Sequence, residues 1–297
     1  MNEKELITLI KSTVNSEYIG DDCAYLKDLG IVVTQDSLVE GVHFSLDFIT
    51  PYQLGFKSVA VNISDICASG AEPEYLTISL SLPNYVNENF VKNFYEGAKD
   101  AAQNAKIVGG DITGSDKIYI SVCAIGNCTK RKISSRSNAK KGYTVIVSGE
   151  HGNSAQGLKL LLKGEKDRNK FTDAHLTPLP QLKFSKEIAE NINCDYAMMD
   201  TSDGLADALI QIAKSSDVTI SVKTSKIPHD PSVDLETVLY GGEDYQLVAV
   251  VPEEILSKIS DYTIIGKVTN NGFKLIIDGK EINDIDKKIY NHFEEKK

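Results

Sequence analysis

The chain has 297 residues, 41% hydrophobic and 25% charged, so it can bury a sizeable core in one large or, as we expect, two medium domains. Its net charge of 32 − 42 = −10 argues against nucleic acid as the main partner. No apolar run approaches the roughly 20 residues that cross a bilayer, and the start MNEKELITLIK is too polar for a secretory signal. We therefore expect a cytoplasmic protein without a membrane partner. The five cysteines form no C-x-x-C pair, which favours reduced thiols over disulfides or structural zinc.

An amphipathic helix is predicted for residues 3–14, and IGDD follows, with Asp21 and Asp22 on a tight turn behind Gly20. Adjacent carboxylates repel each other unless a cation lies between them. A solvated Gly-Asp turn is the simpler alternative.

A short apolar strand is predicted for residues 31–33 and places Thr34 and Asp36 at a strand end, with His43 beyond a Gly turn. Strand ends and the loops after them are where α/β proteins gather ligands. These side chains are therefore candidates for a binding site.

The next helix, predicted for residues 54–69, is apolar almost all round and so belongs in a core. Polar residues break the pattern on a single stripe, formed by Ser58, Asn62, Asp65 and Ser69. An isolated buried carboxylate is strongly unfavourable, so Asp65 needs a cation, a donor network or a water-filled cleft. Neighbouring donors alone could satisfy it. Pro73 prevents continuation of the helix, and residues 75–82 alternate as a strand.

After a helix over residues 88–106, the sequence predicts a short strand, a turn at Gly109-Gly110-Asp111 and a longer strand. The glycine N–H groups could face a phosphate beside Asp111, or the segment could be a hairpin with a solvated acid. Arg136 lies in the basic stretch 129–142, which resembles a domain junction, where a solvated arginine is the simpler interpretation.

In the second half, the glycines of residues 149–164 do not form a Walker phosphate loop, and the protein-kinase motif set is absent. DTSDGL predicts Ser202 as a helix N-cap, with Asp200 and Asp203 at the helix start. Helix capping and a metal or phosphate site both fit this pair. Glu243 follows Gly241-Gly242 before an apolar strand, and a hairpin is predicted at residues 271–272.

Six aspartates thus occupy strand ends, Gly turns or helix starts. If they converge, each close pair repels by about 4 kcal/mol at an effective dielectric near 20, which requires multivalent cations. Oxygen-only ligands favour magnesium or manganese over zinc, and magnesium completed by phosphate oxygens is typical of phosphoryl transfer from a nucleotide.

The ordered motifs extend over nearly the whole chain and resemble the thiamine-monophosphate kinase family of the aminoimidazole-ribonucleotide synthetase superfamily. They are IGDD (19–22), TQDSLVEGVHF (34–44), AVNISDICASGAEP (60–73), VGGDIT (108–113), MDTSDGL (199–205) and YGGEDYQL (240–247). VEGVHF and GGEDY are specific to the kinase within this superfamily.

The resemblance implies an α/β fold with two domains, 1–137 and 138–297, the first carrying a mixed sheet that pairs across a homodimer. It implies ATP-dependent phosphorylation of thiamine monophosphate to thiamine diphosphate with several Mg²⁺ ions, without a side-chain general base. The positions that match the family's magnesium ligands are Asp22, Thr34, Asp36, Asp65, Asp111, Asp200 and Asp203. Nucleotide-binding positions are Gly110, Asp111, Arg136, Ser202 and Tyr95, and substrate-binding positions are His43, Glu243 and Tyr290.

The chain departs from the family pattern at Gln35, Thr177, Gln181 and Ile289. These departures weaken one possible metal ligand, a phosphate role for the loop HLTPLPQ, and the expected stacking of Tyr290 on the substrate. Three alternatives stay open: another ATP-using superfamily member with a different small substrate, a noncatalytic protein of the same fold, and a metal-dependent phosphohydrolase.

Overall fold

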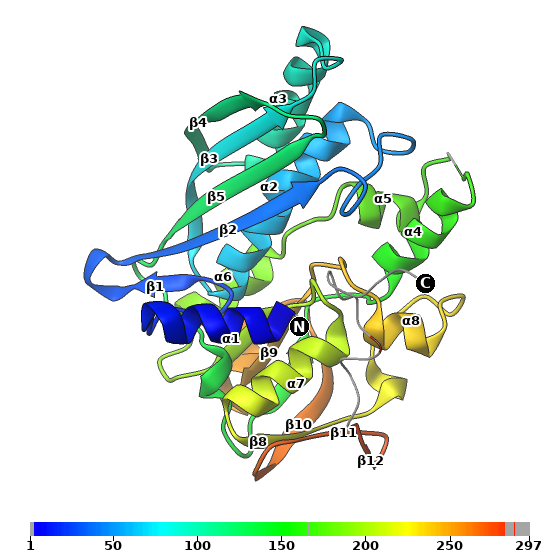
Figure 1. Cartoon of the computed structure of the whole chain (residues 1–297). Helices are drawn as coiled ribbons and strands as arrows, with labels where there is room; N and C mark the ends of the chain where they lie inside the picture. Colours follow the sequence, from blue (N-terminus) through cyan, green and yellow to red (C-terminus); the bar gives the residue numbers. More distant parts are fainter. Residues whose placement is uncertain (1–2, 166, 283–287, 289–297) are drawn as a thin grey trace.

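The computed structural model describes residues 3–165, 167–282 and 288, which form two β-sheets with helices packed on and between them (Figure 1). The helices are α1 (Glu3–Val14), α2 (Pro51–Ala68), α3 (Glu88–Ala102), α4 (Asn153–Leu162), α5 (Lys170–Leu176), α6 (Leu182–Asn191), α7 (Leu205–Ser215) and α8 (Leu235–Tyr240). The strands are β1 (Ala24–Leu26), β2 (Ile31–Val39), β3 (Glu72–Leu82), β4 (Lys106–Gly114), β5 (Tyr119–Asn127), β6 (Thr144–Val147), β7 (Ala197–Asp200), β8 (Val218–Val222), β9 (Leu247–Val251), β10 (Thr263–Asn271), β11 (Lys274–Ile277) and β12 (Lys280–Glu281). None of the helices in this part of the chain has the length and apolarity that a bilayer crossing requires.

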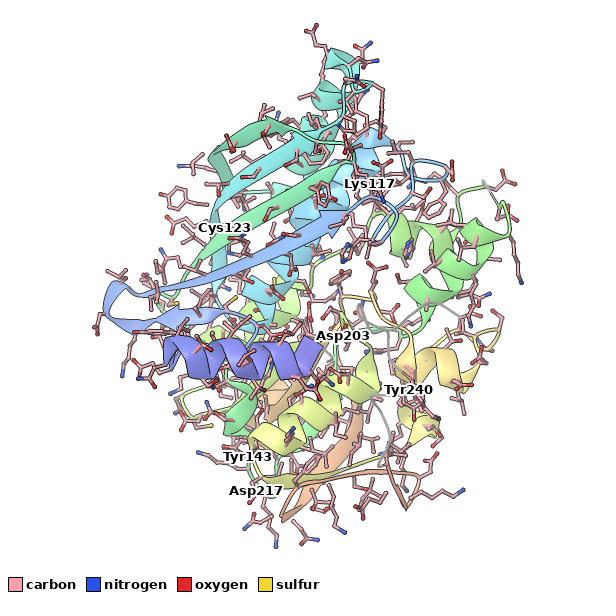
Figure 2. The ribbon with its side chains drawn as sticks, in the orientation of Figure 1. Lys117, Cys123, Tyr143, Asp203, Asp217 and Tyr240 are labelled. Atoms are coloured by element: carbon pink, nitrogen blue, oxygen red, sulfur yellow. The ribbon has the colours of Figure 1, made fainter. Side chains whose placement is uncertain are left out.

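The first sheet is mixed and has the strand order β1-β2-β5-β3-β4. Its strands alternate between apolar and polar residues, so each side of the sheet has one character. Ile120 and Val122 of β5 are buried on the side of α2, whereas Ser121 and Cys123 lie on the opposite, open side (Figures 1 and 2). Strand β4 forms an exposed edge. The described residues of the single chain therefore leave one face and one edge of this sheet uncovered.

Helix α2 connects the two halves of the molecule. It begins at Thr50 with a capping box in which Thr50 and Gln53 satisfy each other's backbone N–H groups, and Pro51 fits the first turn. It is buried almost throughout, because α3, β2 and β5 pack on it from the first half, and β7 and α6 from the second. A Cβ at Gly55 would lie 1.8 Å from the Phe94 carbonyl oxygen, so only glycine permits this approach of α3. The packing places Asp65 where the halves meet.

The second sheet has the order β12-β11-β8-β10-β6-β9-β7 and is covered on both faces near its centre. Every residue of β6 is buried, as continuous apolar strands require. Val145 and Val147 pack into the cluster formed with α7, while Ile146 faces the cluster shared with α2 and α6. The apolar strands thereby attach the second sheet firmly to α2.

Two local predictions about the first sheet are wrong. The predicted turn at Gly109-Gly110-Asp111 lies inside β4, where Gly110 has φ 156° and a Cβ there would lie 1.8 Å from the Ile78 carbonyl oxygen. The glycine therefore serves close strand packing. Thr34 and Asp36 lie within β2, which continues to Val39, because β2 pairs with β5 over its whole length.

Two further predictions fail in the second half. Ser202 is not a helix N-cap, since α7 begins at Leu205 and Gly204 precedes it. The Ser202 hydroxyl donates a hydrogen bond to Asp200 instead. Residues 271–272 do not form a hairpin between paired strands, because β8 lies between β10 and β11.

Candidate active site

A cleft of about 930 Å³ is lined by both halves of the chain. The predicted site residues that line it are Asp22, Thr34, Asp36, His43, Asp65, Arg136, Ser202, Asp203 and Glu243. Asp203 and Tyr240, both labelled in Figure 2, contribute from the second half. Residues up to 221 positions apart in the sequence, 243 minus 22, thus meet at one cavity.

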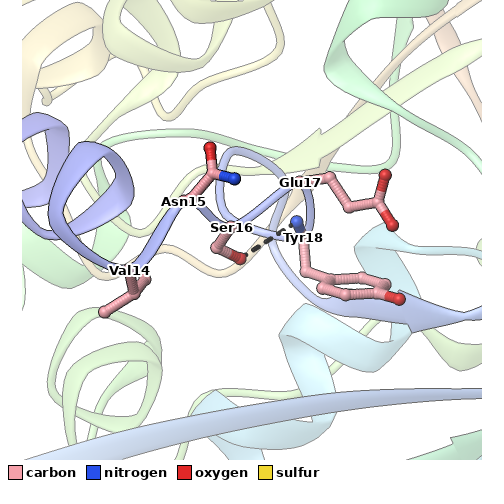
Figure 3. A pocket seen from close by; sticks show the side chains of 5 residues that line it. All are labelled: Val14, Asn15, Ser16, Glu17 and Tyr18. Carbon is pink, nitrogen blue, oxygen red and sulfur yellow. Dashed lines mark hydrogen bonds between the residues drawn. The ribbon is translucent and has the colours of Figure 1, made fainter.

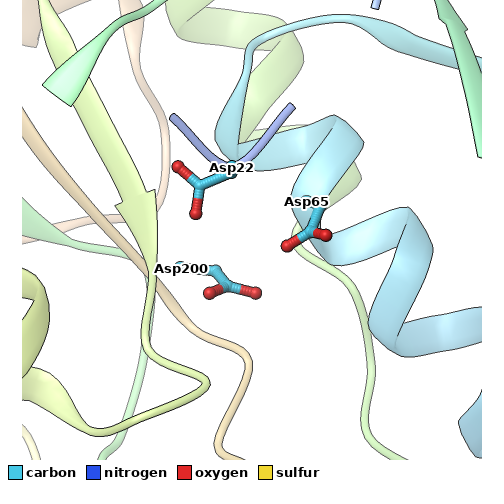
Figure 4. Close-up of side chains that lie close together, drawn as sticks. All are labelled: Asp22, Asp65 and Asp200. Carbon is cyan, nitrogen blue, oxygen red and sulfur yellow. The ribbon is translucent and has the colours of Figure 1, made fainter. Parts of the chain in front are cut away.

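Three carboxylates converge at the edge of the cleft, where Asp22 and Asp65 belong to its lining and Asp200 is buried next to them. Asp22 comes from the loop before β1, Asp65 from α2 and Asp200 from the end of β7, and each offers an oxygen within 4.8 Å of the others (Figure 4). No ordinary fold requirement brings three acids together, since their charges repel.

The ionisation of these acids reflects that crowding. Burial and the charges of Asp36, Asp200 and Asp22 raise the pKa of Asp65 well above its usual value, although a hydrogen bond from Thr34 opposes the shift. Burial and Asp22 raise the pKa of Asp200 to about 6, against hydrogen bonds from Ser64 and Ser202. The cluster therefore gains from any cation that binds it.

Neighbouring donors hold the carboxylates in place without neutralising them. The Thr34 hydroxyl donates to Asp65 Oδ2 at 2.6 Å, and the Ser64 hydroxyl donates to Asp200 Oδ2 at 2.6 Å. Ser202 donates to the other oxygen of Asp200 at 2.8 Å. Hard oxygens in this arrangement fit Mg²⁺ better than zinc, which prefers nitrogen and sulfur.

Arg136 lies beside this cluster and pairs with one of its members. Its Nη2 donates to Asp22 Oδ1 at 3.0 Å, and its backbone N–H donates to Asp21 Oδ1 at 2.7 Å. Burial would lower the pKa of Arg136, but Asp22 raises it, so the guanidinium stays charged. A fixed positive charge at the cleft wall is suited to an anionic ligand.

Aromatic and aliphatic side chains also line the cleft, among them Val42, Phe44, Phe48, Leu158, Leu162, Tyr240 and Tyr245. Further polar residues share the lining, and two of them are Glu243 and His43. Glu243 forms an ion pair with Lys57, and its other carboxylate oxygen lies 3.4 Å from His175 Nδ1. The Val39 N–H donates to His43 Nδ1 at 3.0 Å, so the neutral ring carries its proton on Nε2. The cleft thus combines an anion-handling region with a region suited to a flat organic group.

Four described residues of the predicted site are not among those that line this cleft, and one of them, Asp200, is buried beside Asp22 and Asp65, which do line it. The other three lie farther away. Gly110 and Asp111 lie on the exposed edge strand β4, and Tyr95 lies on α3, packed against Phe94 and the core. Tyr290 and Ile289 lie outside the described residues.

Sequence reasoning overlooked Lys57 and Ser64 of α2. Lys57 is 1% exposed and pairs with Glu243, and Ser64 bonds Asp200. The signal for Lys57 was present, since a lysine in a helix that is apolar on every side must find a partner for its charge. By contrast, Ser58 donates to the Leu54 carbonyl, and Asn62 bonds the Ser58 carbonyl and the Asp36 N–H, so both act structurally.

A second hollow is bordered by residues 14–18, after α1 (Figure 3). Its wall is one contiguous loop, in which the Tyr18 N–H donates to the Ser16 hydroxyl. It shares no lining residue with the cleft, and Glu17 is the one acidic residue among the five that line it.

Comparison with known proteins places this geometry in a family. Residues 20–128 match the model of the AIR synthase related protein, N-terminal domain. The chain is 37% identical over 311 residues to the thiamine-monophosphate kinase of Aquifex aeolicus, covering 99% of this chain and 98% of the relative. It is 37% identical to the thiamine-monophosphate kinase of Bacillus subtilis, covering 80% and 78%. A solved structure described as AaThiL complexed with AMPPCP and TMP superposes with a TM-score of 0.90 at 36% identity, covering 98% of this chain and 97% of that one.

Fold and site together define an α/β enzyme of the AIR-synthase-related class, with acids gathered in a cleft between two sheets. Within that class, the chain belongs to the thiamine-monophosphate kinase family. The resemblance inferred from the motifs is thereby confirmed.

Proposed function

We propose that this protein uses ATP to phosphorylate thiamine monophosphate, giving thiamine diphosphate and ADP. The observation that carries the proposal is the convergence of Asp22, Asp65 and Asp200 within 4.8 Å, at a cleft whose lining also includes aromatic side chains. Acids that repel one another suit a divalent cation and phosphate oxygens, and the aromatic wall suits a heterocycle. Family membership supports the same activity.

The acidic cluster is the proposed Mg²⁺ site, with Asp22, Asp65 and Asp200 at its centre and Thr34, Asp36 and Asp203 around it. When bound, Mg²⁺ supplies the positive charge that lets two phosphate groups approach each other. Arg136 and Ser202 are proposed to hold the nucleotide phosphates, because both line the cleft beside the acids.

The acceptor is itself a phosphate and is anionic near neutral pH, so no side-chain base has to activate it. The protein therefore acts by positioning and charge neutralisation, with direct in-line attack of the acceptor on the γ-phosphoryl group. His43 and Glu243 are proposed to bind the organic part of the acceptor among the aromatic residues. A phosphorylated protein intermediate would contradict this route.

The open face and edge of the first sheet support a homodimer, in which domain 1–137 pairs with a second copy. The edge strand β4 exposes Val108 by 59% and Ile112 by 65%, and such an edge is a site for strand or sheet association. Asp111 lies on this edge and not in the cleft of its own chain. In the dimer, we propose that Gly110 and Asp111 complete the cleft of the partner subunit.

One assay tests the function. Purified protein is incubated with ATP, Mg²⁺ and thiamine monophosphate, and thiamine diphosphate and ADP are quantified. Equal formation of both products supports the proposal. Phosphate release without the acceptor would favour a phosphohydrolase, turnover with another small acceptor would favour a different superfamily activity, and no turnover would favour a noncatalytic role in the cytoplasm.

A further inference from the structure

A second charged cluster lies in the cleft and contains no member of the aspartate site. Lys57 Nζ is 3.0 Å from Glu243 Oε1, and His175 Nδ1 is 3.4 Å from Glu243 Oε2. Lys57 comes from α2, His175 from α5, and Glu243 from the loop before β9. Both oxygens of one carboxylate are thus held by residues from different elements.

Lys57 has no other role in the described part of the chain. Its side chain is 1% exposed, and among the described residues Nζ makes no hydrogen bond of good geometry; its contact with Glu243 is an ion pair at 3.0 Å. The surrounding residues of α2, Val59, Ala60 and Val61, are buried and apolar. Since an apolar residue would usually stabilise such a position as well as an ion pair does, stability alone does not account for this lysine.

Glu243 is held in an unusual conformation as well. Its φ is 65°, a left-handed value that costs a non-glycine residue energy, and its N–H donates to the Ser202 carbonyl at 2.7 Å. Unlike Lys57, its side chain is 29% exposed and lines the cleft. The backbone of Glu243 is therefore held by Ser202 and its carboxylate by Lys57, while the side chain still faces the cleft.

His175 is the uncharged member of the cluster. Burial and the nearby Lys57 charge lower its pKa to about 3, despite the opposing effect of Glu243. The Ser154 hydroxyl lies 3.1 Å from its Nδ1 and fixes the ring. The full positive charge that contacts the Glu243 carboxylate is therefore that of Lys57.

We propose that Lys57 is a positioning residue, which holds Glu243 ionised and oriented to accept hydrogen bonds from a flat, cationic heteroaromatic group of the acceptor. This proposal rests on the proposed function, because the acceptor there carries a thiazolium and an aminopyrimidine. The aromatic side chains Phe44, Phe48 and Tyr240 line the same cleft and suit the faces of such rings. Lys57 acts through Glu243 and does not touch the reacting phosphates.

The test compares steady-state kinetics of the wild type and Lys57→Met, which keeps the length of the side chain but removes its charge. The expected result is a KM for thiamine monophosphate raised by about tenfold or more, with kcat within about threefold of wild type and an unchanged KM for ATP. Lys57→Arg should recover part of the loss. An unchanged KM for the acceptor, or an equal loss in kcat, would overturn the proposal.

A double variant separates positioning from a merely structural role and replaces the single variant if that does not fold. If Lys57 acts through Glu243, Lys57→Met/Glu243→Gln has the same acceptor KM as Glu243→Gln alone. If the fold-increases in acceptor KM of the two single variants multiply in the double variant, Lys57 acts independently of Glu243 and the proposal is refuted. Lys159→Met is the matched control, because Lys159 pairs with Asp234 at 3.5 Å outside the cleft and its loss should leave both KM values unchanged.

Kinetics of the wild type separate a failure of the proposed function from a failure of the proposed role of Lys57. If it does not phosphorylate thiamine monophosphate, the proposed function fails, and the inference that depends on it fails too. If it does, and Lys57→Met keeps the wild-type KM while melting at the wild-type temperature, the inference alone is refuted.

Discussion

The two charged regions of the cleft treat their acids in opposite ways. At the aspartate cluster, burial and like charges raise the pKa of Asp200 to about 6, because the serines that bond it bring no positive charge. At the Lys57 cluster, burial would raise the pKa of Glu243, but the charge of Lys57 is the largest opposing influence and the pKa is lowered. In the first region Arg136 pairs with Asp22, and the remaining negative charge of Asp65 and Asp200 is left to a ligand, whereas in the second region Lys57 neutralises Glu243. A carboxylate that is paired with a positive side chain is suited to orienting a ligand, and a carboxylate without such a partner is suited to binding a cation.

The largest effect is expected from a substitution that disrupts the aspartate cluster. Asp65→Asn should reduce kcat by on the order of 10³-fold, because a central oxygen ligand loses its charge. The same change should raise the free energy of unfolding of the metal-free protein, since it removes a buried, repelled carboxylate. Turnover and thermal melting in a metal chelator measure the two effects. Asp261→Asn, at an exposed ion pair with Lys183, is the control and should change neither. Near-wild-type turnover in Asp65→Asn would remove this residue from the site.

The next prediction tests whether the acidic region is complete within one chain. Asp65→Asn and Asp111→Asn should each be nearly inactive, but mixing them with exchange of subunits should restore about a quarter of wild-type activity. Half of the dimers would then be mixed, and each would carry one intact site if Asp111 serves the partner's cleft. Activity is measured before and after exchange. No recovery, in a mixture shown to contain mixed dimers, would place Asp111 in its own subunit's site or outside any site.

The opposite pKa shifts of the two regions predict how pH affects stability. Asp200 holds its proton to about pH 6 when folded, against an ordinary value of 3.8. The folded state thus binds more protons between these values, so the free energy of unfolding of the metal-free protein should fall by about 2 kcal/mol as pH rises from 4 to 6. Added Mg²⁺ should stabilise the protein more at about pH 7.5 than at about pH 5, because the cation competes with the proton.

Thermal melting across this pH range, with and without Mg²⁺, measures the effect. Asp200→Asn tests it, because the variant lacks this carboxyl group and its effect on the neighbouring Asp65, while subtracting the variant's pH profile removes the contributions of distant carboxylates. Identical profiles for wild type and variant would contradict the raised pKa of Asp200.

The smallest expected effect concerns a supporting hydroxyl. Ser64→Ala removes the hydrogen bond to Asp200 and should weaken Mg²⁺ affinity by about tenfold, with a smaller change in kcat at saturating metal. Ser185→Ala is the matched control, since Ser185 is also fully buried but donates to the Cys67 carbonyl. Metal titration followed by turnover measures both variants, and equal affinities would assign Ser64 a purely structural role.

Local reasoning from the sequence succeeded where a segment's own pattern sufficed. The helix predicted over residues 3–14 is confirmed as far as its end at Val14, and α2 was anticipated from its apolar periodicity. Reasoning from local turn chemistry failed at Gly109-Gly110-Asp111, because the close approach to Ile78, and not a chain reversal, requires a glycine there. Ser202 resembled an N-cap because only its neighbours in sequence were visible.

The sequence by itself determined the candidate acids, the buried helix that carries Asp65, and the ordered motifs of the kinase family. Only the tertiary structure decided which acids meet, that Asp111 lies on an open edge, and that Lys57 is the partner of Glu243. The physical reason is the separation in sequence of the residues that interact. Periodicity and capping depend on residues within a few positions of one another, whereas Asp22 and Asp200, or Lys57 and Glu243, are brought together by the packing of two sheets on α2.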